Sequence, residues 1–203
     1  MSKVSIFLVA VLALTAIVYK SIEYVENQLT PLPVYGLENH IVPAFEFTNQ
    51  LNEMVSSTDI RDKIWVADFF FTSCPTICPK MTRNLQSLHD FIRDDQDIRI
   101  LSFTVDPKRD SPERLKSYAD TYRVNHESWS FLTGEKEAIY RLGNRGFLVS
   151  ASTAGVEDED FIHSENIVLV DQNQRIRGFY NGTDPKCVKQ ILNDIKKLKK
   201  TKA

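Results

Sequence analysis

The chain has 203 residues but only three cysteines, Cys74, Cys78 and Cys187. Three cysteines are too few for a disulfide scaffold, and an odd number leaves at least one thiol unpaired or reactive. The chain also lacks a basic excess, since 25 Lys and Arg stand against 27 Asp and Glu, and the net charge is −2. We therefore expect no nucleic-acid partner, because the composition offers no general means of neutralising phosphates.

Internal repeats and low-complexity tracts are also lacking. What remains is an ordinary globular composition, 42% hydrophobic and 26% charged, which can bury one core of normal size. We predict three parts: a membrane anchor or signal at residues 1–22, a tether at 23–42, and one globular domain at 43–200.

The first part contains an uncharged apolar run, Val4 to Tyr19, flanked by Lys3 and Lys20. Such a run is typical of a membrane-targeting segment, and residues 21–22 could extend it toward the roughly 20 residues of a span. A cleavable signal and an uncleaved anchor both fit. We favour a single-pass anchor, because no small-x-small cleavage site follows the run.

The flanks of this run also bear on localisation. Nothing Arg- and Ser-rich precedes the run, which argues against a mitochondrial transit peptide and for a bacterium. Glu23 and Glu26 follow Lys20, so we expect the N-terminus inside the cytoplasmic membrane and the domain on its periplasmic side. Pro31, Pro33 and Gly36 give the next segment the turn punctuation of a tether.

Hydrophobic periodicity predicts the elements of the domain. Strands are expected at 44–48, 64–71, 98–105, 129–132, 167–170 and 176–180. Helices are expected from Cys78 or just after it, behind the N-cap Ser111, at 135–142, and behind the N-cap Asp184. The order is a hairpin, then β-α-β-α, then β-β-α, which matches an α/β thioredoxin-like sandwich with an N-terminal β-hairpin and insertions.

Two thiols stand at the junction between the buried-type strand 64–71 and the helix that follows it. In the segment 72–79 (TSCPTICP), Cys74 and Cys78 offer either two soft sulfur ligands for a metal or one oxidisable pair. Pro79 has no amide proton, so we place Cys78 at the helix tip and Cys74 in the preceding turn. Because a helix N-terminus stabilises thiolates, we predict that Cys78 is the more acidic thiol.

Asp68 interrupts the same strand, where an ionised carboxylate is costly unless it is paired. Its spacing ahead of Cys74 resembles that of the buried Asp ahead of the first active-site Cys in thioredoxins. Our hypothesis is that Asp68 accepts or relays a proton when the dithiol is metallated or oxidised. An exposed Asp at a sheet edge is an equally good interpretation.

The remaining single residues have plainer interpretations. Cys187 falls in the first turn of the last helix beside an apolar stripe, as a small buried hydrophobe would. His89 and His126 are expected to be solvated or capping residues. For Asp106, Arg109 and Asp110, turn chemistry ahead of a capped helix is a sufficient explanation.

Three motifs together carry a resemblance to a known family. They are FTSCPTICP at 71–79, TVDPKRDSP at 104–112, and His163-Ser164 ahead of a strand that ends at Asp171. In this order they resemble the SCO/SenC family of copper-binding proteins, over about Val42 to Lys197 together with the N-terminal anchor. The resemblance implies a membrane-tethered, thioredoxin-like domain that helps to assemble the copper centre of cytochrome oxidase.

The resemblance also implies a ligand set for a copper ion: Cys74, Cys78 and His163, the last in an inserted loop. Two thiolates suit Cu(I), an imidazole suits either oxidation state, and three ligands leave a position open for exchange. This chain has Thr76 where many members have an acidic residue. The acidic run 157–160 ahead of His163 is interpreted as a solvated loop in preference to a recognition surface.

The leading hypothesis is therefore a copper metallochaperone, not an enzyme, with a copper-receiving oxidase subunit and a copper donor protein or thiol reductant as partners. The alternative is a thiol-disulfide oxidoreductase in which Cys74 and Cys78 cycle and keep a partner's copper-ligand cysteines reduced. A thiol peroxidase is a weaker option, because Phe71 stands where peroxiredoxins use Thr.

Overall fold

The computed structural model describes residues 3–149 and 165–201. The chain forms two compact units, residues 1–32 and residues 33–203. The first unit contains helix α1 (Lys3–Leu29). Over the described ranges, no helix has both the length and the apolar character needed to cross a membrane. The single-pass anchor therefore stays a prediction.

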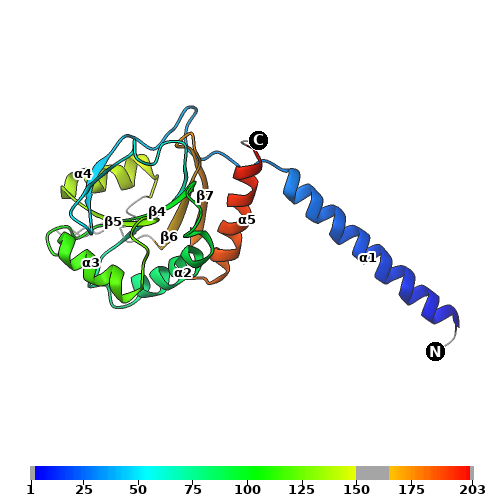
Figure 1. The fold of residues 1–203 in the computed structure, drawn as a ribbon. Helices are drawn as coiled ribbons and strands as arrows, with labels where there is room; N and C mark the ends of the chain where they lie inside the picture. The colour runs from blue at the N-terminus through cyan, green and yellow to red at the C-terminus, as the bar shows by residue number, and fades with distance from the viewer. Residues whose placement is uncertain (1–2, 150–164, 202–203) are drawn as a thin grey trace, which may run out of the picture. The chain divides into compact units, whose positions relative to one another are not determined.

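In the second unit the described strands form one mixed sheet with the order β2-β1-β5-β4-β3-β6-β7 (Figure 1). Strands β3, β4 and β5 run parallel, whereas β6 runs antiparallel to β3, and β1–β2 and β6–β7 are hairpins. The bounds are β1 Glu46–Asn49, β2 Met54–Ser56, β3 Ile64–Phe70, β4 Ile98–Thr104, β5 Trp129–Thr133, β6 Asn166–Val170 and β7 Ile176–Asn181.

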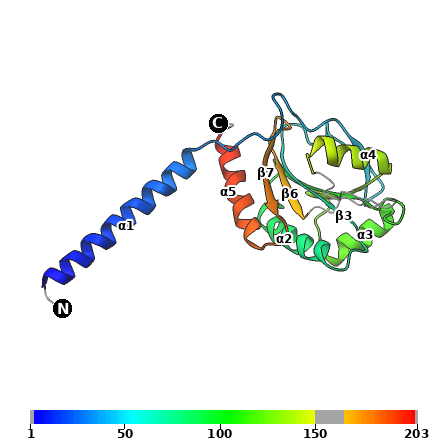
Figure 2. The ribbon, with the colours of Figure 1, turned by 180° about the vertical axis from the view of Figure 1, so that it is seen from behind.

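Helices cover both faces of this sheet. Helices α2 (Ile77–Ile92), α3 (Pro112–Thr121) and α5 (Lys186–Thr201) lie on one side, and α4 (Lys136–Arg141) lies on the other (Figures 1 and 2). The chain moves from β3 to β4 to β5 in one direction across the sheet, so two right-handed crossovers place α2 and α3 on the same side.

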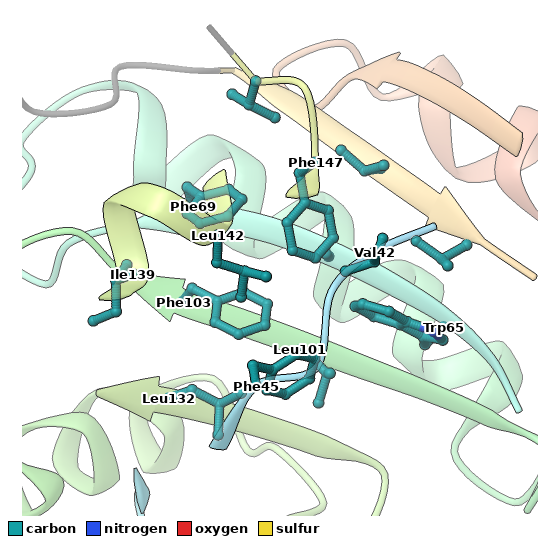
Figure 3. Close-up of a cluster of buried hydrophobic side chains, with 14 of the residues drawn as sticks. Val42, Phe45, Trp65, Phe69, Leu101, Phe103, Leu132, Ile139, Leu142 and Phe147 are labelled. Carbon is teal, nitrogen blue, oxygen red and sulfur yellow. The ribbon is translucent and has the colours of Figure 1, made fainter. Parts of the chain in front are cut away.

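Strand β3 lies inside the sheet, between β4 and β6, and every one of its side chains is buried. Odd-numbered residues such as Trp65 and Phe69 face α4, where they pack with Phe103 and Phe147 in an aromatic cluster (Figure 3). Even-numbered residues such as Phe70 face the other layer. This two-sided burial explains the almost wholly apolar sequence of the strand.

The predicted strands, the N-terminal hairpin and the α/β order are confirmed, with differences at two boundaries. Helix α2 begins at Ile77, one residue before Cys78. The helix expected at 135–142 continues beyond α4 as a π-helical turn, Leu142–Gly146. The glycine at 146 lets this turn pack closely against Pro43, because a Cβ at that position would come within 2.9 Å of Pro43 Cδ. The predicted His-bearing insertion falls at residues 150–164, outside the described residues.

An N-terminal extension (residues 33–42) precedes the first strand and contacts the rest of the second unit at three points. Tyr35 forms an isolated bridge with Ile176, and Val42 N donates to Gln174 O at 2.8 Å. His40 Nε2 lies 2.9 Å from Gly146 O. These residues fall within the segment predicted as a tether, and the three-part division of the chain stays a prediction.

Candidate metal centre

The two thiols lie where the central strand passes into a helix. Strand β3 ends at Phe70, whose carbonyl accepts the last ladder hydrogen bond from Val105 N at 2.8 Å. The chain then turns, with Cys74 N donating to Phe71 O at 3.2 Å. Cys78 is the second residue of α2. The sequence therefore placed both cysteines correctly, one in the turn and one at the helix tip.

Both thiols are free and buried, with exposed fractions of 7% for Cys74 and 3% for Cys78. They lie close together, because the backbone amide of Cys78 donates to Cys74 Sγ at 3.5 Å. The amides at the start of α2 are thus directed at the sulfur of the preceding turn. Such amides have no partner within the helix and favour an anion.

This arrangement sets the acidity of the thiols in the reverse of the predicted order. Burial opposes the Cys74 thiolate, but backbone amides of Cys78, Thr76 and Ile77 donate to it and hold its pKa below the ordinary value. Burial raises the pKa of Cys78, and the neighbouring Cys74 and Asp68 raise it further. The prediction that Cys78 is the more acidic thiol is wrong. The free amides at the N-terminus of α2 donate to the sulfur of Cys74, which precedes the helix, and not to that of Cys78.

Asp68 lies within β3 between β4 and β6, so the interpretation as an exposed edge residue is wrong. Its side chain is 1% exposed and accepts from Ser102 Oγ at 2.5 Å. Ser102 Oγ in turn accepts from Trp129 Nε1 at 2.9 Å. Burial raises the pKa of Asp68 to about 7, although the Ser102 hydrogen bond opposes this shift. A buried carboxyl group with a raised pKa therefore lies close enough to Cys78 to raise the pKa of that thiol.

The three histidines considered from the sequence differ in what the structure says of them. His163 lies outside the described residues. His89 is buried, with Nε2 2.8 Å from Ser128 Oγ, and burial lowers its pKa. His126 is partly buried and lies 3.0 Å from Gln50 Nε2. The expectation that His89 is a solvated or capping residue is wrong, because its side chain is buried, whereas 25% of the His126 side chain stays exposed.

Cys187 is 1% exposed on the inner face of α5, so its interpretation as a small buried hydrophobe is confirmed. In the part of the chain that the structure describes, no cluster of three His, Cys, Asp or Glu side chains could hold a metal ion. Within the described residues, Cys74 and Cys78 offer two neighbouring sulfurs. Such a pair fits a soft cation such as Cu(I), which thiolates select over hard cations.

One residue was undervalued from the sequence. Asp110 was assigned to turn chemistry, but its side chain is fully buried and accepts hydrogen bonds from Thr72 and Thr104. Thr72 is two residues ahead of Cys74. The sequence offered little indication of this role, because Asp110 directly precedes the helix start formed by Ser111 and Pro112. Only the burial of its side chain distinguishes it from a capping residue.

The fold and the dithiol agree with a known family, whose model, described as SCO1/SenC, matches residues 35–200. The chain belongs to the SCO1/SenC family. A curated relative from Bacillus subtilis strain 168, named as a SCO1 protein homolog, is 34% identical over 160 residues, covering 78% of this chain and 82% of the relative. The resemblance identified from the three sequence motifs is thereby confirmed.

Solved structures of the family share this architecture. A SCO1/SenC family lipoprotein from Bacillus anthracis strain Ames has a TM-score of 0.70 at 31% identity, over 82% of this chain and 99% of that one. BsSco, described with a disulfide switch and as a member of the Sco family of cytochrome c oxidase assembly proteins, has a TM-score of 0.68 at 32% identity, over 81% and 96%. The chain therefore has the thioredoxin-like α/β fold of Sco proteins.

A more distant Sco structure was solved with its metal. ScoI from Arabidopsis thaliana with copper bound has a TM-score of 0.61 at 25% identity, over 77% of this chain and 98% of that one. Members of this family are thus described both with copper bound and with a disulfide. These are the two chemistries that the sequence suggested for the Cys74 and Cys78 pair.

Proposed function

We propose that this Sco-family protein is a copper metallochaperone that binds Cu(I) or Cu(II) through Cys74, Cys78 and His163. It assists assembly of the copper centre of cytochrome c oxidase. The observation that carries the proposal is the buried pair of thiols at the β3–α2 junction, joined by the hydrogen bond from Cys78 N to Cys74 Sγ. Sco relatives described with copper bound or as oxidase assembly proteins support it.

The donor set suits transfer better than storage. Two sulfurs on adjacent structural elements bind Cu(I) strongly, and His163 would extend the set to three and accommodate Cu(II). A three-ligand site keeps a position through which an incoming ligand from a partner can attach before the cysteines release the metal. The partners are then a copper-receiving oxidase subunit and a copper donor or thiol reductant.

A second function is favoured by the unequal acidity of the thiols. Cys74, with its pKa held low by backbone amides, would attack a partner's disulfide, and Cys78 would resolve the mixed disulfide. The balance is complete: the two protein thiols are oxidised to one disulfide, and the partner disulfide is reduced to two thiols. A related Sco protein is described with a disulfide switch.

In both functions we assign Asp68 the role of a proton acceptor or relay. The thiols must lose protons when they are metallated or oxidised, and the raised pKa of Asp68, about 7, lets its carboxyl group take up and release a proton near neutral pH. The short hydrogen bond from Ser102 keeps the carboxyl group in the layer beneath α2.

We also propose that residues 1–22 hold the domain at the periplasmic face of a bacterial cytoplasmic membrane. The support is the apolar run between Lys3 and Lys20. Attachment of a Sco domain to a membrane has a parallel in the structural neighbour from Bacillus anthracis, which is described as a lipoprotein.

The test uses the reduced chain and adds Cu(I) and Cu(II) in separate titrations. Wild type should bind one copper per chain, and Cu(II) should produce a sulfur-to-copper charge-transfer band. Cys74→Ser should abolish that band. His163→Ala should weaken Cu(II) binding more than Cu(I) binding, whereas His126→Ala, which changes a histidine held by Gln50, should leave both affinities unchanged.

Two results decide against the leading function. Wild type that holds no copper but reduces a partner disulfide would leave only the oxidoreductase. Copper binding that survives replacement of both cysteines would place the metal elsewhere and remove the proposed ligand set.

A further inference from the structure

A polar cluster lies beside the dithiol and consists of Thr72, Thr104, Asp110 and Arg114. Asp110 is its centre, with no exposed side-chain surface. Its Oδ2 accepts from Thr104 Oγ1 at 2.5 Å and from Thr72 N at 3.0 Å, and its Oδ1 accepts from Thr72 Oγ1 at 2.5 Å. Arg114 Nε lies 3.6 Å from Oδ1. The carboxylate therefore joins the end of β4, the start of α3 and the turn that carries Cys74.

Full burial makes this carboxylate dependent on its donors. A buried acceptor without partners is strongly destabilising, and a charged one more so. Two of its three hydrogen bonds described above come from Thr72, 38 positions away in the chain. A residue that only shaped the turn before α3 would need neither of them. The contacts to Thr72 thus indicate that Asp110 has a role at the turn that carries Cys74 (residues 71–76, called the cysteine turn below).

Thr72 is held from a second direction. Its hydroxyl donates to Asp110 and accepts from Arg114 Nε at 2.7 Å, so both of its hydrogen-bonding roles are occupied. Residues 71–76 belong to no helix or strand. Tertiary contacts such as these must therefore fix the position of Cys74, two residues after Thr72.

The same helix also contacts the far side of the dithiol. One turn after Arg114, Tyr118 Oη lies 2.8 Å from Thr82 Oγ1, and Thr82 Oγ1 donates to Cys78 O at 2.9 Å. Helix α3 thus contacts the chain just before Cys74 and just after Cys78, at both ends of the segment that carries the two thiols.

We propose that Asp110 is a positioning residue for the Cys74–Cys78 pair. By holding Thr72 against α3, it keeps Cys74 Sγ at the amide of Cys78 and limits the separation of the two sulfurs. Formation of the disulfide and capture of a cation between the thiols then need little rearrangement. The part of the inference that concerns copper rests on the proposed function, and the part that concerns the disulfide does not.

The test compares two matched variants of the full chain, Thr72→Val and Thr104→Val. Each removes one hydroxyl that donates to Asp110 at 2.5 Å, but only Thr72 belongs to the cysteine turn. The first readout is the equilibrium of the reduced chain with glutathione, in which two protein thiols form one disulfide while one glutathione disulfide becomes two glutathione thiols. The second is Cu(I) affinity in competition with a chelator.

We expect Thr72→Val to lower both the disulfide-forming equilibrium constant and the Cu(I) affinity by about tenfold, the size of one hydrogen bond to a charged group. Thr104→Val should lose a similar amount of stability to urea but leave both constants within about threefold of wild type. Arg114→Leu, which removes the second contact to the Thr72 hydroxyl, should shift the constants in the same direction as Thr72→Val.

Equal shifts in Thr72→Val and Thr104→Val, or none in Thr72→Val, would overturn the positioning role. If wild type binds no copper, the proposed function fails, and the glutathione equilibrium still decides the role of Asp110. Both threonine variants retain the buried carboxylate and its backbone donor, so the comparison does not depend on an Asp110 variant that fails to fold.

Discussion

Cys74 and Cys78 have nearly the same local sequence, since each precedes a proline, yet the structure makes them unlike. The difference comes from their positions relative to the first amides of α2. Those amides are directed at Cys74 Sγ, whereas Cys78 belongs to the buried face of the helix. A thiol inside the first turn therefore gains less from the helix N-terminus than a thiol just ahead of it.

This difference predicts the order of alkylation in the reduced, metal-free chain. Because its pKa is lowered, Cys74 should react with iodoacetamide at pH 7 about ten times faster than Cys78, whose pKa is raised. Peptide mass spectrometry at partial labelling measures the order. Cys187, with its pKa raised to about 11 by burial, should react only after unfolding. Labelling of Cys78 first would contradict the geometry.

Asp68 predicts a distinctive dependence of stability on pH. Its pKa of about 7 in the folded chain lies above the ordinary 3.8, because burial penalises the charged form. Between about pH 4 and 7 the unfolded chain has released this proton while the folded chain keeps it. The contribution of Asp68 to the free energy of unfolding therefore falls as pH rises through this window.

Asp68→Asn should remove that fall. Relative to the variant, wild type should lose up to about 4 kcal/mol of unfolding free energy between pH 4 and 8. Urea unfolding at several pH values measures it. Asp59 provides a control of opposite sign, since hydrogen bonds from Ser56 lower its pKa, and its contribution is lost as pH falls. A difference between wild type and Asp68→Asn that is flat with pH would contradict the raised pKa.

At the scale of elements, one buried aromatic side chain links the segment after α4 to strand β3. Phe147 follows the π-helical turn and packs edge-on against Trp65 and Phe69 of β3, with ring centroids 5.5 and 5.3 Å away (Figure 3). It therefore fastens the α4 segment to the central strand, and its ring is completely buried.

Phe147→Ala should lower the free energy of unfolding by about 3–5 kcal/mol, because a buried ring is lost and a cavity remains. Phe91→Ala is the matched control, since Phe91 lies on α2 with 73% of its surface exposed, and should change stability by no more than about 0.5 kcal/mol. Chemical denaturation of both variants makes the comparison. Equal losses would mean that the aromatic cluster does not govern this layer.

The elements themselves follow largely from local pattern. Strand β3 was predictable because a strand buried on both faces must be continuously apolar, and α3 because Ser111 and Pro112 begin it. The π-helical turn after α4 was not predictable. It depends on the close approach of Gly146 to Pro43, about a hundred residues earlier, and no local periodicity encodes such a contact.

At the scale of the whole molecule, the N-terminal extension (residues 33–42) belongs to the second compact unit. Its contacts to Ile176, Gln174 and Gly146 reach the β6–β7 hairpin and the end of the π-helical turn. The family match also begins inside this segment, at residue 35. The folded domain should accordingly begin near residue 33, ten residues before the predicted boundary at 43.

Truncation tests this boundary. A chain of residues 33–203 should unfold at nearly the same temperature as the full chain, whereas a chain of residues 43–203 should unfold several degrees lower, because it loses these backbone contacts and the burial of Val42. Thermal unfolding followed by circular dichroism measures the difference. Identical midpoints for the two truncated chains would show that residues 33–42 act as a tether after all.

The sequence by itself determined the order of the elements, the place of both cysteines and the family, because periodicity, proline positions and motifs are local properties. Only the tertiary structure decided which thiol is the more acidic, that Asp68 is buried near Cys78, and that Asp110 accepts hydrogen bonds from Thr72. Burial and the direction of a hydrogen bond depend on residues tens of positions apart. They exist only after the sheet and α3 have brought those residues together.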